Sequence, residues 1–190
     1  MNMHDLIRAA RSYRRFDQRS RLTPATLKQL VDLGRLSASG GNLQPLKYVC
    51  SCESELNARI FPALRWAGYL SDWDGPVEGE RPAGYIILVS DATVAKSAGV
   101  DHGLAAQSIV LGAAEIGLGA CIIGSIDRDM LRASLDLPNH YELLLVIALG
   151  TPAEVITVDP VSDGNIRYWR DSNDVHHVPK RSLDDVLLEL

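Results

Sequence analysis

Five arginines lie within eleven residues near the N-terminus, in the stretch 11–21 with the sequence RSYRRFDQRSR. The whole chain has a formal net charge of -5, so this local positive charge runs against the overall balance. The first part of the stretch combines the guanidinium groups of Arg11 and Arg14 with the hydroxyl of Ser12, donors that suit a small phosphate group. The stretch therefore predicts an anion site, whether the phosphate belongs to a nucleic acid, a nucleotide or a flavin.

If these arginines stood alone, a solvated turn between two helices would be the favoured explanation. Three other polar features favour a binding site instead. They are the loop SASGGNLQP at residues 37–45, a Gly-Ser turn at residues 124–125, and the basic pair Lys180 and Arg181. Polar groups that suit a ligand are thus spread along the chain, and the tertiary structure must bring them together.

Other phosphate and nucleophile motifs fail on spacing. Residues 117–124, GLGACIIG, place Ile122 where the third glycine of a dinucleotide fingerprint belongs, and they lead into a strand instead of opening a helix. No Gly-Lys-Ser/Thr triplet of a P-loop and no GxSxG nucleophile motif occurs in the sequence. We therefore expect no catalytic side-chain nucleophile.

Metal-binding residue types occur without a metal-ligand pattern, because the two neighbouring histidines project differently and one Asp-His pair stands alone. We expect no metal, and capping or surface polarity from four residues: Asp101, His102, His176 and His177. The cysteines form neither a CxxC motif nor a disulfide framework. We expect three buried free thiols: Cys50, Cys52 and Cys121.

The composition is that of a soluble globular protein. The chain has 190 residues, of which 46% are hydrophobic and 23% charged, so one domain over 1–190 with a substantial core is expected. The acidic balance, with a pI near 5.5, argues against a general nucleic-acid binder. The N-terminus lacks the apolar core of a signal peptide, so we expect a cytoplasmic protein.

Helices and strands are expected in mixed order, which indicates an α+β domain. Thr23 and Pro24 mark the start of an amphipathic helix as its N-cap and first residue. The aromatic and charged stretch 66–82 is expected to be a surface segment. The helix over 101–118 is rich in small residues, which predicts burial on several sides, at the centre or at a subunit interface. The predicted helices are 3–12, 23–37, 53–61, 101–118 and 127–135, and the predicted strands are 46–52, 84–90, 120–123, 143–149 and 166–169.

Over nearly its whole length the chain resembles the FMN-dependent nitroreductase family. RSYRRF at 11–16 matches the family's phosphate motif R-S-x-R/K-x-F, and SASGGNLQP at 37–45 matches its flavin loop S-x-S-x-x-N-x-Q-P. IGLGACIIGSID at 116–127 resembles the segment that passes the flavin ring, and VPKRSLDD at 178–185 resembles the closing basic segment.

The resemblance implies a nitroreductase-like fold, with a central, mainly antiparallel sheet flanked by helices. It implies a homodimer that holds one FMN in each of two interface clefts. The implied activity is hydride transfer from NAD(P)H to nitroaromatic, quinone or similar electron-poor acceptors by a ping-pong mechanism. FMN carries the chemistry, so no catalytic side chain is implied.

The resemblance also assigns twelve FMN-binding residues. The phosphate would be held by Arg11, Ser12 and Arg14, within a motif that includes Tyr13, and by Lys180 or Arg181. Short polar groups of the partner subunit would reach the ring's pyrimidine edge or the ribityl hydroxyls, and they belong to Ser39, Asn42 and Gln44. Gly40 and Gly41 would let the backbone come close. The backbone N–H groups of Gly124 and Ser125 would lie near the flavin N5 atom.

The sequence departs from the family pattern in two places. Ala10 stands where many members have a basic residue, and the Gly-Ser turn at 124–125 lacks an acidic residue that some members carry. Trp66, Tyr69 and Trp73 either stack on a planar acceptor or pack against the protein. Two alternative functions stay open: a flavin carrier or sensor with little turnover, and an arginine-rich nucleic-acid module.

Overall fold

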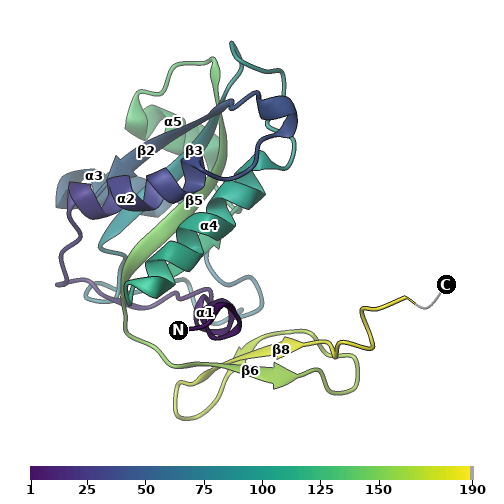
Figure 1. Cartoon of the computed structure of the whole chain (residues 1–190). Helices are drawn as coiled ribbons and strands as arrows, with labels where there is room; N and C mark the ends of the chain where they lie inside the picture. Colours follow the sequence, from purple (N-terminus) through teal and green to yellow (C-terminus); the bar gives the residue numbers. More distant parts are fainter. Residues whose placement is uncertain (189–190) are drawn as a thin grey trace.

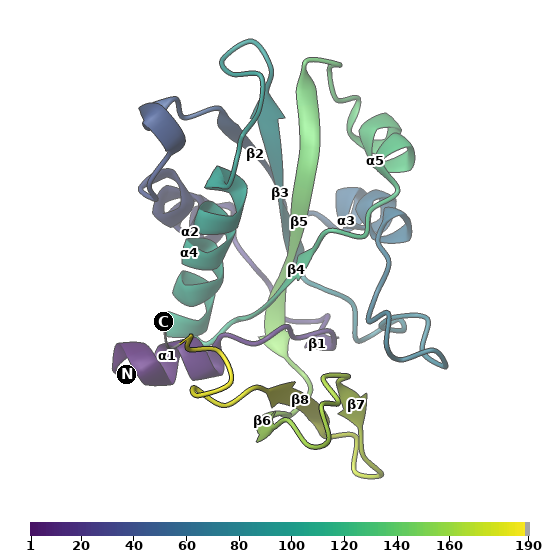
Figure 2. The same cartoon turned by 90° about the vertical axis from the view of Figure 1, so that its right-hand side faces the viewer.

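The structure is a computed structural model that describes residues 1–188. Its main sheet has five antiparallel strands in the order β1-β5-β3-β2, with β4 pairing residues 146–150 of β5 on the edge opposite β3 (Figures 1 and 2). The strands are β1 (Phe16–Asp17), β2 (Leu46–Ser51), β3 (Gly84–Asp91), β4 (Gly119–Ile123) and β5 (Tyr141–Pro152). The predicted α+β class and mainly antiparallel sheet are confirmed.

Helices cover both faces of this sheet. The helices α2 (Pro24–Arg35) and α4 (Asp101–Glu115) lie on one face, and α3 (Ser54–Ile60) and α5 (Arg128–Leu135) lie on the other (Figure 2). All eight residues of β3 are buried, which explains its continuous apolar sequence. Because successive side chains of a strand point to opposite faces, Ile86 packs in the core beneath α2 and α4, and Ile87 packs in the core on the other side.

The helix boundaries follow the capping signals. Thr23 accepts a hydrogen bond from the backbone N–H of Thr26, and Pro24 opens α2 as predicted. Helix α1 spans Met3–Ala9, and α4 ends at Glu115, three residues before its predicted end. A methyl group on Gly112 of α4 would lie 2.1 Å from Leu33 Cδ1 of α2, so a larger residue at this position would force the Leu33 side chain to move.

The prediction that α4 is buried on several sides holds only for its inward faces. Ala105, Ala106 and Ile109 are buried, whereas Leu104 on the outer face is 45% exposed. Within one chain α4 is therefore a helix of the outer layer, and its outer face carries Leu104 among polar residues such as Gln107 and Ser108.

A second sheet was largely missed by the sequence analysis. It contains β6 (Ile156–Pro160), β7 (Trp169–Arg170) and β8 (His176–Lys180) in the order β6-β8-β7, with β6 and β8 parallel. It lies beyond the end of the main sheet at which β5 finishes (Figures 1 and 2). The predicted strand 166–169 was wrong except at Trp169, because pairing with β8 and not local sequence decides where β7 begins.

The stretch 66–82 is not simply a surface segment, because part of it belongs to the core. Trp66 is 9% exposed, and Ala67 and Pro76 are also buried. Gly75 has a φ of 118°, and a Cβ there would lie 2.7 Å from Trp66 Cδ1. Trp66 and Trp73 pack against the core, while Tyr69 stays exposed against Tyr168. Of the two alternatives for these aromatic residues, packing against the protein is therefore the one that applies to both tryptophans.

The expectation of three buried thiols is correct for one cysteine. Cys121 in β4 is buried, and burial raises the pKa of its thiol to about 11. Cys52 is half-buried and Cys50 is exposed, because β2 is the outermost strand of the main sheet. Among residues 1–188, no helix combines the length and the apolar character needed to cross a membrane.

Candidate functional site

The arginine-rich stretch is divided in two by strand β1. Phe16 of β1 is completely buried and pairs with Pro152 at the end of β5. Arg11 and Arg14 lie on the N-terminal side and line one cavity, whereas the exposed Arg19 and Arg21 line a different cavity on the other side. The interpretation that only the first half of the stretch contributes to the anion site is consistent with this division.

The cavity next to Arg11, here called the Arg11–Lys180 pocket, has a volume of about 330 Å³. Four of the residues assigned to the phosphate line it together, although they come from opposite ends of the chain: Arg11, Ser12, Arg14 and Lys180. None of the described residues in its lining is acidic. The remaining lining residues are Ala10, Gln107, Val110, Ala120, Ile122, Tyr168 and Val178.

The two arginines of this pocket are held by different contacts. Arg11 donates from Nη2 to the carbonyl oxygen of Ile7 at 2.6 Å, and its Nε is buried with no hydrogen-bond partner in the described part of the chain. Arg14 donates from Nη1 to the carbonyl oxygen of Ser12 at 3.2 Å, and its guanidinium lies 4.7 Å from the ring centre of Tyr168. Both guanidinium groups therefore keep donor capacity for a further acceptor.

Strand β4 connects this pocket to the Gly-Ser turn. The backbone N–H of Tyr13 donates to the carbonyl oxygen of Ala120 at 3.0 Å, which fixes the phosphate motif against β4. Ala120 and Ile122 line the pocket, and Gly124 comes next on the same face because strand side chains alternate. Gly124 and Ser125 are exposed and lie outside the pocket lining. The Ser125 carbonyl oxygen accepts a hydrogen bond from the Arg65 N–H at 3.0 Å.

Two predicted residues of this group do not line the pocket. The ring of Tyr13 packs against the core, next to Gly119, and burial raises the pKa of its hydroxyl. Arg181 is exposed and follows β8, whereas Lys180, the last residue of β8, lines the pocket. The geometry therefore favours Lys180 over Arg181 as the basic group from the C-terminal segment.

The loop 37–45 is fixed by the carboxylate of Asp101, for which the sequence predicted only capping or surface polarity. The Ser39 hydroxyl donates to Asp101 at 2.6 Å, and the Gly40 N–H donates to the same carboxylate at 2.9 Å. The hydrogen bond from Ser39 is the main cause that lowers the pKa of Asp101, and the bond from Gly40 adds to it. Asp101 is buried, so the expectation of surface polarity is wrong for this residue. The sequence signal for a specific role of Asp101 was its place at the start of the helix predicted for 101–118.

The loop residues line a second cavity. Gly41, Asn42 and Gln44 all have positive φ angles, between 52° and 56°, and the Gln44 N–H donates to the Ser39 hydroxyl at 2.9 Å. Ser39 and Gln44 line a cavity of about 430 Å³ between α2, β2 and the start of α4, and Gly40 and Asn42 are exposed beside it. In the described chain its lining and that of the Arg11–Lys180 pocket have no residue in common. The two predicted halves of the FMN site are therefore not joined within one chain.

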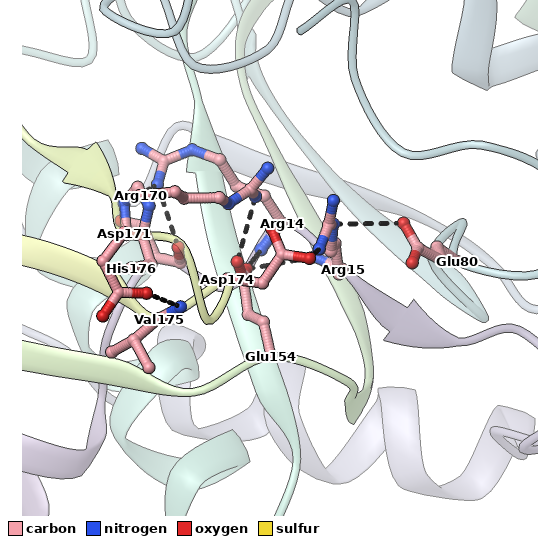
Figure 3. Close-up of polar contacts among 10 residues, drawn as sticks. Arg14, Arg15, Glu80, Glu154, Arg170, Asp171, Asp174, Val175 and His176 are labelled. Carbon is pink, nitrogen blue, oxygen red and sulfur yellow. Dashed lines mark hydrogen bonds and ion pairs between the residues drawn. The ribbon is translucent and has the colours of Figure 1, made fainter.

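A buried carboxylate ties the phosphate motif to the second sheet (Figure 3). The side chain of Glu154 is 1% exposed and accepts hydrogen bonds from the backbone N–H groups of Arg14 and Arg15. It also forms an ion pair with Arg170 of β7 at 3.0 Å. Arg15, the next arginine of the motif, contacts Glu80 at 3.2 Å and Asp174 at 3.3 Å, so its guanidinium is occupied by carboxylates.

His177 links the three strands of the second sheet. Its Nδ1 lies 2.7 Å from Asp159 of β6, its Nε2 lies 3.5 Å from Asp171 after β7, and its ring stacks on Trp169. The hydrogen bond to Asp159, with a smaller contribution from Asp171, raises the pKa of His177 above its usual value of 6.5. The interpretation of surface polarity is therefore incomplete for His177. It is wrong for His176, which is completely buried.

We expect this histidine to make the stability of the protein depend on pH. A raised pKa in the folded state means that the stabilisation is fully present below about pH 6.5 and is lost as the pH rises through the folded-state value. The difference in unfolding free energy between the wild type and His177→Gln should therefore shrink from pH 6 to pH 9 in urea titrations. A difference that stays constant over this range would exclude protonated His177 as the source.

No group of three or more His, Cys, Asp or Glu side chains that suits a metal ion occurs in the part of the chain that the structure describes. Asp101 and His176, two residues of types that bind metals, instead make the hydrogen bonds to Ser39 and Arg14.

Comparisons with known proteins identify the family. The Nitroreductase family model matches residues 7–151. An NADPH-dependent oxidoreductase of Staphylococcus saprophyticus is 25% identical over 176 residues, and the match covers 80% of this chain and 66% of the relative, so the chain spans just under two thirds of the relative's length.

Solved structures show the same fold. A Parabacteroides distasonis protein described as an NADH dehydrogenase/NAD(P)H nitroreductase has a TM-score of 0.68 at 20% identity, with 90% of this chain and 99% of that chain covered. An FMN-dependent nitroreductase of Clostridium difficile has a TM-score of 0.64 at 19% identity, with 80% and 88% covered. The predicted nitroreductase-like fold is confirmed, and the chain belongs to the Nitroreductase family.

Proposed function

We propose that this protein is an oxidoreductase that binds FMN and transfers hydride from NAD(P)H to nitroaromatic, quinone or similar electron-poor acceptors. The observation that carries the proposal is the Arg11–Lys180 pocket, in which donors from both ends of the chain face one cavity. The relatives agree with it, because one is an NADPH-dependent oxidoreductase and another an FMN-dependent nitroreductase.

The donors of the pocket fit the phosphate group of FMN. Arginine, serine and lysine side chains donate hydrogen bonds to phosphate oxygens, and arginine does so with two parallel bonds. The buried Nε of Arg11 has no partner among the described residues, so a phosphate oxygen would satisfy it. Because none of the described residues that line the pocket is acidic, the pocket does not repel a phosphate group.

The face of β4 that carries Ala120 and Ile122 suits the rest of the cofactor. Ala120 lines the pocket, and Gly124 lies four residues further along the strand direction, a separation of roughly 13 Å at 3.3 Å per residue. A flavin with its phosphate at Arg11 and Arg14 would extend along this face. The backbone N–H groups of Gly124 and Ser125 would then be donors to the ring at N5.

The loop 37–45 would complete the site from a partner subunit. Its cavity is separate from the Arg11–Lys180 pocket in one chain, which is the arrangement that a site shared between two subunits requires. Helix α4 lines both cavities, and a second subunit would cover its outer face, where Leu104 is exposed. In such a homodimer Asn42 and Gln44 would offer amide groups to the flavin, and Ser39 and Asp101 would hold the loop in place.

FMN supplies the hydride chemistry when it is bound, and the protein residues bind and orient it. The positive charges of Arg11, Arg14 and Lys180 hold the phosphate end. Gly124 and Ser125 are exposed, so a flavin ring beside them would be accessible to NAD(P)H and to the acceptor. Ping-pong steady-state kinetics are therefore expected.

The purified protein tests this proposal directly. We expect a yellow protein, or one that becomes yellow on addition of FMN, and we expect the flavin absorbance to bleach when NADPH or NADH is added without oxygen. Adding a quinone or a nitroaromatic compound should then restore the absorbance. A protein that takes up no FMN contradicts the proposal, and one that binds FMN but is not reduced by either nucleotide supports the flavin carrier or sensor instead.

We expect Arg14→Ala to weaken FMN binding by about 10- to 150-fold, which corresponds to about 1.5–3 kcal/mol for a hydrogen bond to a charged group. Fluorescence titration of the apoprotein with FMN measures the change. Arg19→Ala is the matched control, because Arg19 is exposed, lies beyond β1 and pairs with Asp17 instead of lining the pocket. Equal FMN affinities of the two variants would contradict the phosphate role of Arg14.

A further inference from the structure

His176 is a completely buried residue of β8 that contacts the phosphate motif from the opposite end of the chain (Figure 3). Its Nε2 lies 3.0 Å from Nη1 of Arg14. Arginine carries only donors, so Nε2 must accept the hydrogen bond, and the single proton of the neutral imidazole must lie on Nδ1.

The stability of the fold does not explain an imidazole at this position. Nδ1 has no hydrogen-bond partner among residues 1–188, and a buried donor without a partner is unfavourable. An apolar side chain of similar size would avoid that cost. Burial, with the nearby positive charge of Arg14, lowers the pKa of His176 to about 4, so the ring is neutral near pH 7 and its Nε2 is available as an acceptor.

The contact with His176 determines how the guanidinium of Arg14 is oriented. Nη1 makes both hydrogen bonds of this side chain within the described residues, one to His176 and one to the carbonyl oxygen of Ser12. The ring of Tyr168 lies 4.7 Å from the guanidinium of Arg14 and 5.3 Å from the ring of His176. It therefore limits movement of the guanidinium out of its own plane. The edge formed by Nε and Nη2 stays available, and this is one of the edges with which arginine forms paired bonds to a phosphate.

We propose that His176 is a positioning residue for the phosphate group of the flavin. It accepts a hydrogen bond from Nη1 of Arg14 and so turns the Nε–Nη2 edge toward the Arg11–Lys180 pocket. This inference rests on the proposed function, since it assumes that the pocket holds the FMN phosphate. The sequence predicted only capping or surface polarity for His176. Nothing in the local sequence links this residue to Arg14, 162 residues away.

Three substitutions of His176 separate positioning from packing. Glutamine can place its side-chain oxygen near the position of Nε2, whereas asparagine places it near Nδ1, and leucine has no acceptor. We expect His176→Leu and His176→Asn to bind FMN about tenfold more weakly than the wild type, the effect of about one hydrogen bond. We expect His176→Gln to stay within about threefold of the wild type.

Riboflavin, which lacks the phosphate, is the ligand that reveals the role. Titration of each apoprotein with FMN and with riboflavin gives the ratio of the two affinities. A positioning role predicts that the ratio falls in His176→Leu and His176→Asn and is kept in His176→Gln, with riboflavin affinity unchanged. Equal losses for both ligands, or an unchanged ratio in all three variants, would overturn it. If His176→Leu does not fold, the comparison of His176→Asn with His176→Gln gives the same answer.

The Arg14→Ala variant distinguishes a failure of the phosphate assignment from a failure of the role of His176. If Arg14→Ala leaves the ratio of FMN to riboflavin affinity unchanged, the phosphate assignment itself is wrong. If Arg14→Ala lowers the ratio while His176→Leu and His176→Asn do not, the phosphate assignment stands and the role of His176 is wrong. The double variant Arg14→Ala/His176→Asn should bind FMN no more weakly than Arg14→Ala alone, because His176 acts through Arg14.

Discussion

Replacing Glu154 with glutamine is expected to lower the free energy of unfolding by about 3–5 kcal/mol, the usual cost of breaking a buried ion pair. The side chain is 1% exposed, and its carboxylate accepts hydrogen bonds from two backbone N–H groups and from Arg170. Glutamine keeps the size but leaves the guanidinium of Arg170 buried without a counter-charge. At about 2–4 °C per kcal/mol for a chain of this size, the thermal midpoint should fall by roughly 6–20 °C.

The control for this experiment is Glu78→Gln. Glu78 also pairs with an arginine, Arg81 at 2.9 Å, but its side chain is 74% exposed, so its loss should cost less than about 1 kcal/mol. Urea unfolding of both variants measures the two values. Similar small losses would show that Glu154 does not hold the phosphate motif to the second sheet. A large loss for Glu154 alone would mean that the segment carrying Arg14 depends on a residue of the C-terminal third.

Phe16→Ala is expected to destabilise the protein by about 3–5 kcal/mol, the range for removing a buried aromatic ring. Phe16 is completely buried, and its Cδ1 lies only 3.0 Å from the position that a Cβ on Gly150 would take. Alanine would leave a cavity between β1, β5 and the segment before β3. The substitution should also weaken FMN binding, because Phe16 anchors the strand that follows Arg14 and Arg15.

Denaturant unfolding and FMN titration measure these two effects separately. Phe16→Leu is the control, since it keeps most of the apolar volume and should lose much less stability than Phe16→Ala. If Phe16→Ala were as stable as Phe16→Leu, the ring would not fill the core in the way the structure shows. In the motif RSYRRF the phenylalanine thus has a packing role, while Arg11, Ser12 and Arg14 supply the donors.

Features encoded by neighbouring residues were predictable from the sequence. The cap at Thr23, the apolar run of β3 and the small residues of α4 each have a local pattern, and the structure contains each element within a few residues of its predicted range. The chemical nature of the candidate site was also readable, because the residue types alone say that Arg11, Arg14 and Lys180 favour an anion. The family follows from the same motifs.

The tertiary structure decided which of these groups meet and which are used elsewhere. It brings Lys180 beside Arg11, it commits Arg15 to two carboxylates, and it buries Glu154 and His176 around Arg14. These groupings join residues up to 169 positions apart, and no local periodicity or spacing encodes them. The second sheet was missed for the same reason, since its short strands depend on pairing between distant segments. The sequence by itself therefore determined the family and the residue types that favour an anion, whereas only long-range packing decided which arginines line the cavity and which residues contact them.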